Sequence, residues 1–374
     1  MRKYLLTSVA ILAAGPALAG GVERSNQSMA ILFEQGNYLE FGASYTRPRV
    51  SGEALVDPNI STGNMSEDFW ALDLRFRGQI NDQLSYAIII DEPIGANVAY
   101  PDGTGYDLEG STGTIESRAL TGVLRYAFDG GVSVYGGLRA VRTRGEVDLT
   151  VPLPPPFGPQ NYTMSTNTDT AYGYLLGVAY EVPEIAGRVS LTYNSRITHD
   201  FDSTETFTLP IPPNLPGEDI EREFSTSIPE SLHLEFQTGV AEDTLVFGGV
   251  RWVRWSKFDI SPTIYSQITG GNSLVDYDKP TTTYTIGVGR RFTEQLSGSA
   301  SISHERSGGG QLGNLGPTDG FTSVGLGASY TIDNITLSGG VQYRWLGGGD
   351  TVGNIGRFSG NSATSAGLRV GVRF

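Results

Sequence analysis

The chain has 374 residues, of which 26 are basic, 40 acidic and 3 histidine, with 50 glycines and no cysteine. The missing cysteines exclude disulfides and thiolate metal sites, and three histidines leave almost no material for a metal cluster, so neither a metal nor a cofactor is expected. A formal charge of −14 provides no general attraction for nucleic acid, and no such partner is expected.

Residues 1–19 are predicted to be a secretory signal peptide. Its parts are a charged n-region at Arg2 and Lys3, an apolar h-region at 5–14 and the cleavage pattern Ala-Leu-Ala at 17–19. A membrane anchor, the alternative, needs about 20 apolar residues. Gly15 and Pro16 interrupt this run too early. Cleavage after Ala19 or Gly20 removes two of the 26 basic residues, which leaves 24 against 40 acidic residues.

Apolar and polar residues alternate with a period of two along the rest of the chain, which predicts fourteen β-strands. The clearest case is NITLSGGVQYRW, where Ile335, Leu337, Val341, Tyr343 and Trp345 share one face. The predicted strands are 38–47, 67–80, 83–95, 113–128, 132–148, 168–182, 187–204, 223–240, 244–262, 280–292, 295–307, 320–332, 334–346 and 361–374.

The connections between these strands alternate between six short polar turns and seven long segments rich in proline and glycine. This alternation is typical of an outer-membrane barrel, with short periplasmic turns and long extracellular loops. A soluble β-sandwich, the alternative, gives no reason for such asymmetry. The predicted fold is therefore all-β: a 14-stranded antiparallel transmembrane β-barrel over 38–374, after a short plug-like segment at 20–37.

The last residues, AGLRVGVRF, place Leu368, Val370, Val372 and Phe374 on one face of a strand and arginines on the other. In a membrane every backbone polar group must be paired, so the last strand is expected to close against the first. Phe374 is then expected in an interfacial aromatic girdle.

Three segments resemble the FadL-type outer-membrane transporters of long-chain fatty acids and other hydrophobic molecules. They are SLTYNSRITHDF at 190–201, the IPESLHLEF to VRWVRWSKF region at 228–258, and FRGQINDQLSYAIII at 76–90. Pro229-Glu230 matches the family's Pro-Glu before a strand, and Trp255-Ser256 matches its Trp-Ser. The resemblance runs from about residue 24 to the end and implies a barrel that is plugged by an N-terminal hatch.

The resemblance also implies release of the ligand through the barrel wall at a kinked third strand. Asp91, Glu92 and Pro93 interrupt the apolar third predicted strand, and proline cannot donate a hydrogen bond to a sheet. These three residues either form a lateral gate, as the resemblance implies, or simply mark the end of the strand. In the hatch, Ser28-Met29-Ala30 stands where the family has Asn-Pro-Ala, and the whole segment is short for the family.

Leu149 stands where the family has an arginine for the ligand head group. Arg142 and Arg144 are nearby candidates, and Lys279 lies close to the family's second cationic position. The alternative is that these cations belong to a charge network with acidic residues of the lumen.

Two long loops carry apolar, proline-stiffened sequence, VPLPPPFGP at 151–159 and FTLPIPPNLPG at 207–217. A preordered apolar surface above a barrel mouth is suited to capture an amphiphile, because it loses little entropy on binding. The candidate capture residues are Phe157, Phe207, Leu209, Ile211 and Leu215. The alternative is that the two loops pack together as a cover.

No enzymatic activity is expected. His199 and His304 have acidic neighbours in sequence, but adjacent strand residues point to opposite faces, and His233 with Glu235 lacks a nucleophile. The predicted function is passive transport of long-chain fatty acids or similar hydrophobic molecules in the outer membrane of a Gram-negative bacterium. A structural or adhesive surface barrel and a general porin are the alternatives. Besides the ligand, the expected partners are membrane lipid, lipopolysaccharide and, during biogenesis, the barrel-assembly machinery.

Overall fold

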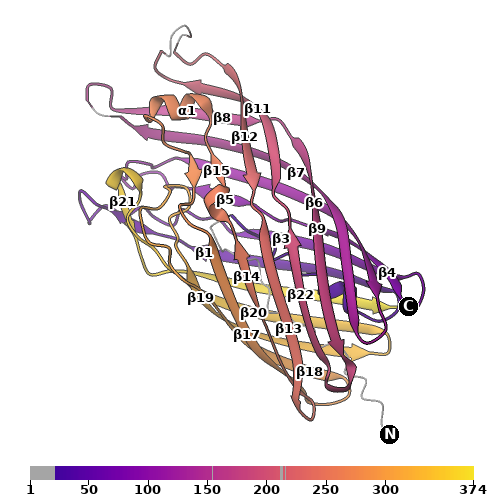
Figure 1. The fold of residues 1–374 in the computed structure, drawn as a ribbon. Helices are drawn as coiled ribbons and strands as arrows, with labels where there is room; N and C mark the ends of the chain where they lie inside the picture. The colour runs from indigo at the N-terminus through magenta and orange to yellow at the C-terminus, as the bar shows by residue number, and fades with distance from the viewer. Residues whose placement is uncertain (1–21, 154, 211–213, 215) are drawn as a thin grey trace.

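The computed structural model describes residues 22–153, 155–210, 214 and 216–374, so the predicted signal peptide lies outside the described residues. The described part of the chain is a closed, 14-stranded antiparallel β-barrel (Figure 1), which confirms the predicted fold class. No helix in these residues is both long and apolar enough to cross a membrane.

The wall consists of eighteen hydrogen-bonded segments. They are β1 (Tyr38–Arg49), β3 (Phe69–Gln79), β4 (Leu84–Asp91), β5 (Ala96–Ala99), β6 (Thr112–Ala127), β7 (Val132–Pro152), β8 (Pro159–Thr166), β9 (Asp169–Val182), β10 (Gly187–Asn194), β11 (Ile197–Phe207), β12 (Ile220–Ile228), β13 (Ser231–Ala241), β14 (Thr244–Val253), β17 (Thr281–Arg291), β18 (Leu296–Glu305), β19 (Phe321–Ile332), β20 (Ile335–Leu346) and β22 (Asn361–Arg373). Four consecutive pairs, β4/β5, β8/β9, β10/β11 and β12/β13, each continue one wall strand across a break, which leaves fourteen strands.

The long connections gather at one end of the barrel and carry the remaining elements (Figure 1). Two small hairpin-like pairs form there, β2 (Gly52–Ala54) with β21 (Gly356–Phe358), and β15 (Asp259–Ile260) with β16 (Val275–Asp276). Short helices complete this end: α1 (Thr263–Ile268), η3 (Trp255–Lys257) and η4 (Val352–Asn354). At the other end η2 (Pro183–Ile185) lies in a short turn, and η1 (Ala30–Phe33) precedes β1.

Several predicted strand boundaries are wrong. The predicted strand 223–240 breaks at Pro229, which has no N–H to donate, and the predicted strand 83–95 ends at Asp91 just before Pro93. The predicted strand 187–204 breaks at 195–196, where the Ser195 hydroxyl takes the place of a backbone partner for the N–H of Tyr174 (2.9 Å). The predicted strand 244–262 ends at Val253, because the chain turns inward through η3.

The barrel closes between its first and last strands. β1 pairs with β22 over twelve residues, from Tyr38 opposite Arg373 to Arg49 opposite Ser362. Beyond β22, the N–H of Phe374 donates to the Asn37 carbonyl at 3.0 Å. The Phe374 ring is 65% exposed and stacks against Phe76, with centroids 6.2 Å apart. The terminal residue thus lies at the seam, among outward aromatic side chains.

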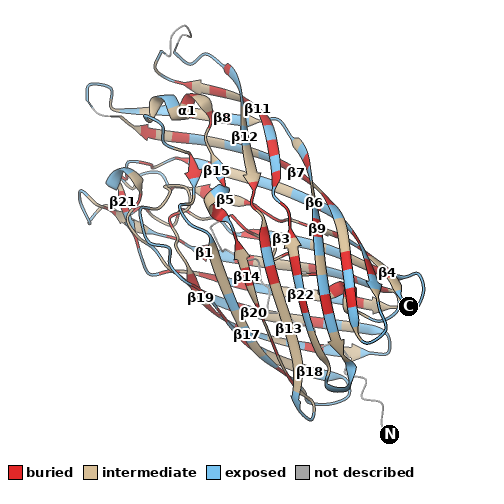
Figure 2. Ribbon diagram, viewed as in Figure 1, coloured by how far each residue is buried: buried red, intermediate tan, exposed pale blue. Residues whose placement is uncertain are grey.

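The polarity of the barrel is the reverse of that of a soluble protein. Along the wall strands exposed and buried residues alternate (Figure 2), and the exposed set is apolar, with Leu138 74%, Leu326 63% and Ile302 54% exposed. The buried set includes charged groups such as Arg139 and Arg251. An apolar outer surface around a polar interior is the pattern of a transmembrane barrel.

We expect Phe374→Asp to lower the amount of barrel in the outer membrane, because it removes an aromatic group from the seam and puts a charge at the lipid interface. Surface abundance and heat-modifiable gel mobility are the measurements. Phe374→Tyr is the matched control and should assemble normally. Normal assembly of the aspartate variant would show that the seam does not depend on this residue.

Candidate functional site

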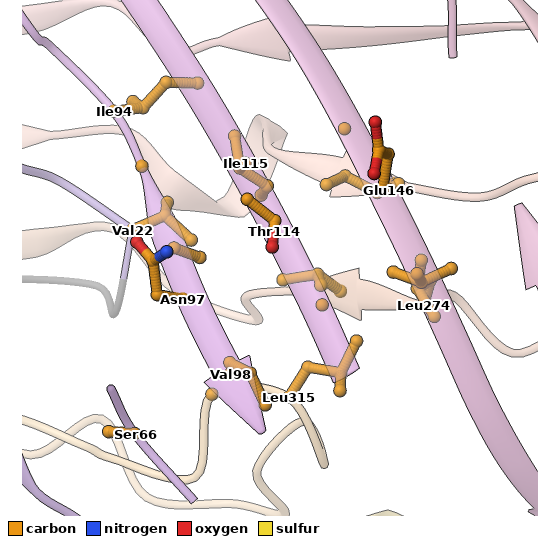
Figure 3. A pocket seen from close by; sticks show the side chains of 18 of the residues that line it. Val22, Ser66, Ile94, Asn97, Val98, Thr114, Ile115, Glu146, Leu274 and Leu315 are labelled. Atoms are coloured by element: carbon orange, nitrogen blue, oxygen red, sulfur yellow. The ribbon is translucent and has the colours of Figure 1, made fainter. Parts of the chain in front are cut away.

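An apolar cavity occupies the lumen towards the loop end of the barrel (Figure 3). Its empty volume, with the open mouth included, is about 1230 Å³. Its apolar lining comes from the wall, the loops and the N-terminal segment, and includes Val22, Met65, Phe69, Ile94, Val98, Ile115, Phe201, Phe224, Leu274 and Leu315. Small-molecule sites in proteins are concave and mostly apolar with a few placed polar groups, and this cavity fits that description.

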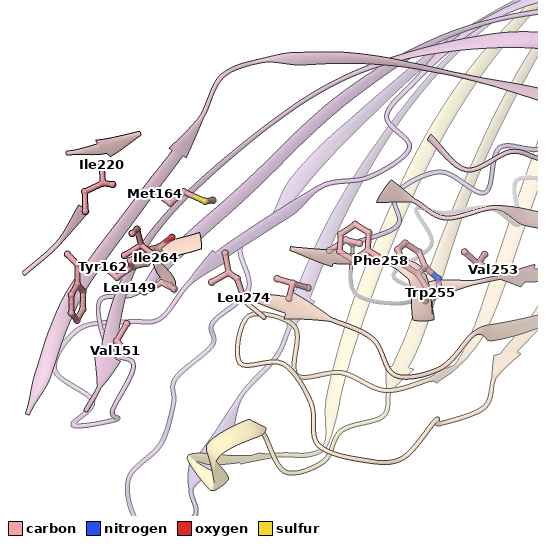
Figure 4. Packing of buried hydrophobic residues seen from close by; sticks show 13 residues of the cluster. Leu149, Val151, Tyr162, Met164, Ile220, Val253, Trp255, Phe258, Ile264 and Leu274 are labelled. Carbon is pink, nitrogen blue, oxygen red and sulfur yellow. The ribbon is translucent and has the colours of Figure 1, made fainter. Parts of the chain in front are cut away.

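A buried apolar cluster forms the ceiling of this cavity (Figure 4). The Trp255 and Phe258 rings pack edge to face with their centroids 5.5 Å apart. The centroid of the Tyr277 ring lies 5.4 Å from that of Trp255 and 5.8 Å from that of Phe258. Leu274 is 5% exposed and belongs to both the cluster and the cavity lining. Because loop residues and wall residues share this cluster, the loops are packed into the barrel mouth.

The N-terminal segment enters the lumen and pairs with the interrupted wall strand. The N–H of Gly95 donates to the Val22 carbonyl at 2.8 Å, and the N–H of Arg24 donates to the Pro93 carbonyl at 3.0 Å. Ser25 donates to the Asp91 carboxylate at 2.6 Å. The segment therefore supplies the hydrogen bonds that the bent strand cannot make to its neighbours.

The wall is open beside this bend. β3 and β4 pair as far as Leu74 opposite Ile90, and pairing resumes where the N–H of Glu67 donates to the Asn97 carbonyl. Residues 68–73 and 91–96 therefore face each other without ladder pairing, and we call this opening the β3–β4 gap. Its outer rim carries Trp70, which is 64% exposed and packs against Tyr45 with ring centroids 5.1 Å apart, so exposed aromatic side chains border the gap.

Arg24 fills the inner side of the β3–β4 gap. Its guanidinium donates to Asn97, lies 4.2 Å from the centroid of the Phe69 ring and is 3.9 Å from the Glu92 carboxylate. Gly95 leaves room for this side chain, since a Cβ there would collide with the guanidinium. The Arg24 side chain is only 9% exposed, lines the cavity, and its Nε has no hydrogen-bond partner.

The half of the lumen nearer the short turns is filled by charge pairs and by η1. Arg369 lies 3.3 Å from Glu40, and Arg75 lies 3.1 Å from Asp73. The Phe33 ring is held between the guanidinium groups of Arg125 and Arg188, at 4.7 and 4.4 Å. This dense, charged floor separates the apolar cavity from the short-turn end.

The predicted hatch residues lie in this floor. Ser28 donates to Glu235 at 2.6 Å, Met29 is 1% exposed, and Ala30 begins η1. Asp91 and Glu92 of the predicted gate are held by Ser25 and Arg24. The chain thus brings the hatch segment and the residues of the predicted gate together.

The predicted capture residues are separated. Phe157 is 57% exposed at the loop end, whereas Phe207 is 4% exposed and lies in the ceiling cluster, with Leu209 packed against it. Ile211 and Leu215 lie outside the described residues.

Of the three predicted head-group cations, only Arg144 borders the cavity. Arg142 and Arg144 lie on the exposed side of β7, and Arg144 is 2.9 Å from Glu116. Lys279 is exposed at the mouth and donates to the Gly308 carbonyl. Its surroundings are acidic: burial and the Asp278 and Asp259 carboxylates raise the pKa of Asp276 above its usual range. Sequence reasoning missed Arg24, because no local pattern brings it beside Asn97, 73 residues away.

A plugged apolar cavity inside a closed, lipid-facing barrel defines an outer-membrane transport protein as the class. The profile of the family described as outer membrane protein transport protein (OMPP1/FadL/TodX) matches residues 13–346. The chain therefore belongs to this family, whose members transport hydrophobic compounds across the outer membrane. No curated protein sequence matches the chain.

Solved structures share the fold at low sequence identity. A Pseudomonas aeruginosa FadL homologue is 15% identical, with a TM-score of 0.76 over 96% of this chain and 97% of that one. The Pseudomonas putida toluene transporter TodX is 14% identical, with a TM-score of 0.64 over 91% and 90%. The Ralstonia pickettii toluene transporter TbuX is 13% identical, with a TM-score of 0.61 over 97% and 92%.

We expect Leu274→Ser to weaken binding of the hydrophobic fluorophore N-phenyl-1-naphthylamine about tenfold, because burial of a leucine side chain contributes about 1.5–3 kcal/mol. Fluorescence titration of the purified barrel is the measurement. Val56→Ser, at a loop position that is 82% exposed, is the control and should bind normally. Equal affinities for the two variants would show that the cavity is not the binding site.

Proposed function

We propose that the protein carries long-chain fatty acids, or amphiphiles with a similar anionic head and apolar tail. The ligand is captured at the apolar loops, enters the cavity and leaves sideways through the β3–β4 gap into the membrane. The observation that carries this proposal is the position of Arg24, a buried cation with an unpartnered Nε, where the apolar cavity meets the opening in the wall.

The cavity suits an acyl chain. Each buried methylene contributes about 0.8 kcal/mol, so a long chain supplies most of the binding free energy. The exposed Phe157 offers a first apolar contact at the loop end, and the ceiling around Phe207 and Leu209 continues it inward. Capture at these loops is part of the proposal.

Arg24 is better placed to bind a carboxylate than are the three cations that the sequence suggested. A guanidinium presents donors in a planar fork that matches a carboxylate. Arg24 is shielded from water, whereas Arg144 is already paired with Glu116 on an exposed surface, where ion pairs contribute little. Arg142 lies outside the lining of the cavity. Arg24 therefore replaces Arg142, Arg144 and Lys279 as the proposed head-group residue.

A neutral aromatic hydrocarbon is the second candidate ligand. The ceiling offers the Trp255, Phe258 and Tyr277 rings, and the structurally similar TodX and TbuX are described as toluene transporters. A neutral ligand has no need of Arg24. The two candidates are therefore separated by the charge at this one position.

We expect Arg24→Met to weaken palmitate binding about tenfold to a hundredfold, since a hydrogen bond to a charged group contributes about 1.5–3 kcal/mol, and to leave toluene binding unchanged. Arg142→Met, the same substitution outside the cavity, should change neither affinity. Both affinities are measured by titration of the purified barrel. If Arg24→Met lowers both, Arg24 only holds the N-terminal segment; if it lowers neither, a neutral ligand is favoured.

Lateral release follows from the shape and charge of the lumen. A fatty acid that continued to the short-turn end would have to pass the paired charges around Arg75 and Arg369 and then hydrate its chain, which the hydrophobic effect opposes. The β3–β4 gap leads from the cavity to the hydrocarbon instead. Phospholipid and lipopolysaccharide are the neighbours that the released ligand would meet.

The double substitution Asp91→Thr and Pro93→Val restores a donor and removes a charge, so it should favour continuous pairing with β3 and lower uptake. Labelled palmitate uptake by cells with equal surface abundance is the measurement, and palmitate binding by the purified variant should persist. Pro280→Val, outside the gap, is the control. Full uptake by the double variant, with its wall shown to be closed, would favour a straight-through channel.

A further inference from the structure

The wall has a second stretch without ladder pairing, between β9 and β11. β9 and β10 pair up to Leu175 opposite Asn194, and Ser195 still donates to the Tyr174 carbonyl. Pairing resumes in the same register where Asn167 donates to the Asp202 carbonyl and β8 meets β11. Residues 168–173 and 196–201 therefore face each other without ladder pairing, six on each side, and we call this the β9–β11 gap.

Side chains of the chain itself close this gap. His199 is 1% exposed; its Nδ1 donates to the Asp169 carboxylate at 2.8 Å, and its Nε2 lies 3.3 Å from the Thr143 hydroxyl. Ile197 lies over Gly173, where a Cβ would collide with it. The closure depends on two side-chain hydrogen bonds and one apolar contact, so it can open without breaking a strand ladder.

The β9–β11 gap is bordered by outward aromatic side chains. Its lower edge carries outward tyrosines, Tyr172, 76% exposed, and Tyr174, whose ring lies 6.1 Å from that of Tyr193. Outward residues of β11 beyond this level are polar: Thr198 bonds Ser227 at 2.9 Å, and Asp200 accepts from Ser225 at 2.6 Å. Tyrosines mark the headgroup level of a membrane, where water can satisfy the unpaired backbone.

The inner face of this gap connects to both the cavity and the first gap. Phe201 and Thr143 line the cavity. Ala171 and Ile197 belong to a buried apolar cluster that also contains Val141 and Ile94, and Ile94 follows Pro93 in the bend of the third wall strand. Continuous apolar packing therefore links the β9–β11 gap to the β3–β4 gap.

We infer that the β9–β11 gap is a lateral entrance, through which hydrophobic compounds dissolved at the loop-side headgroup level of the membrane enter the cavity. The inference rests on the proposed function and adds a second source of ligand, the membrane itself, to capture from water at the loops. The His199–Asp169 pair is the latch of this entrance.

The test cross-links the two latch positions with a disulfide. The chain has no cysteine of its own, so the two introduced thiols can pair only with each other. The variant Asp169→Cys/His199→Cys is reconstituted in nanodiscs, oxidised, and the disulfide verified by mass spectrometry. A palmitate that carries a photoreactive diazirine is supplied in one of two ways. It is either dissolved in the nanodisc lipid beforehand, or added from water bound to albumin and photolysed immediately after the addition. The readout is the yield of adducts on the peptide that contains Leu274. Thr285→Cys/Ser303→Cys, at side chains 2.9 Å apart in the continuous β17–β18 wall, is the matched control.

Oxidation of the latch variant should lower labelling from the lipid severalfold, leave labelling from albumin unchanged, and be reversed by reductant, whereas the control pair should show no change. His199→Ala should raise labelling from the lipid about fivefold, because the loss of one buried hydrogen bond shifts the equilibrium between the closed and open gap by about that factor. Unchanged labelling from the lipid in both variants, or equal loss from both sources, would overturn the entrance. If the unmodified protein is labelled from neither source, the proposed function itself fails.

Discussion

The structure depends on the need to pair every backbone N–H and C=O group that faces hydrocarbon. Closure of β1 on β22 satisfies this need around most of the wall. At the bend after Asp91 the ladder stops, and its place is taken by other groups. Val22 and Arg24 pair with Gly95 and Pro93 from the lumen, and the Ser117 hydroxyl bonds both the N–H and the carbonyl of Ile94. An opening in the wall is therefore possible only because the interior supplies substitute partners.

The same constraint explains the reversed polarity of the lumen. A buried charge is tolerated only when it is paired, and the charged side chains of the lower lumen are held in pairs such as Arg125 with Glu181 and Arg369 with Glu40. These pairs fill the space below the cavity that water would otherwise occupy. Apolar and charged regions of one lumen are thus separated along the barrel axis, and this separation gives an apolar ligand a reason to leave through the wall.

The sequence predicted the fold because its signals are local. Alternation with a period of two located the strands, and turn length fixed their order. Pro93 also marked one of the breaks, since proline cannot join a ladder, whereas the break at Pro229 was not predicted. The break at Ser195 carries no such signal: it arises from a side-chain hydroxyl that replaces a backbone partner. The proposed head-group residue was missed for the same kind of reason, because Arg24 acquires its surroundings from Phe69, Glu92 and Asn97 only after the chain has folded.

Neighbouring residues of the N-terminal segment have two structural roles: one group pairs with the wall, and the other fixes the segment in the lumen. Residues 22–25 pair the bent wall strand, and Arg24 fills the inner side of the β3–β4 gap, while Ser28 and Met29 anchor the segment in the charged floor. Withdrawal of the segment would leave the Gly95 N–H and the Pro93 carbonyl without partners, which is costly in a dry lumen. A carboxylate at Arg24 would compete with Glu92 for the guanidinium and loosen that contact just where the wall is open. Under the proposed function, ligand binding and opening of the gap would therefore be coupled through the Arg24 side chain, without any need for the barrel itself to deform.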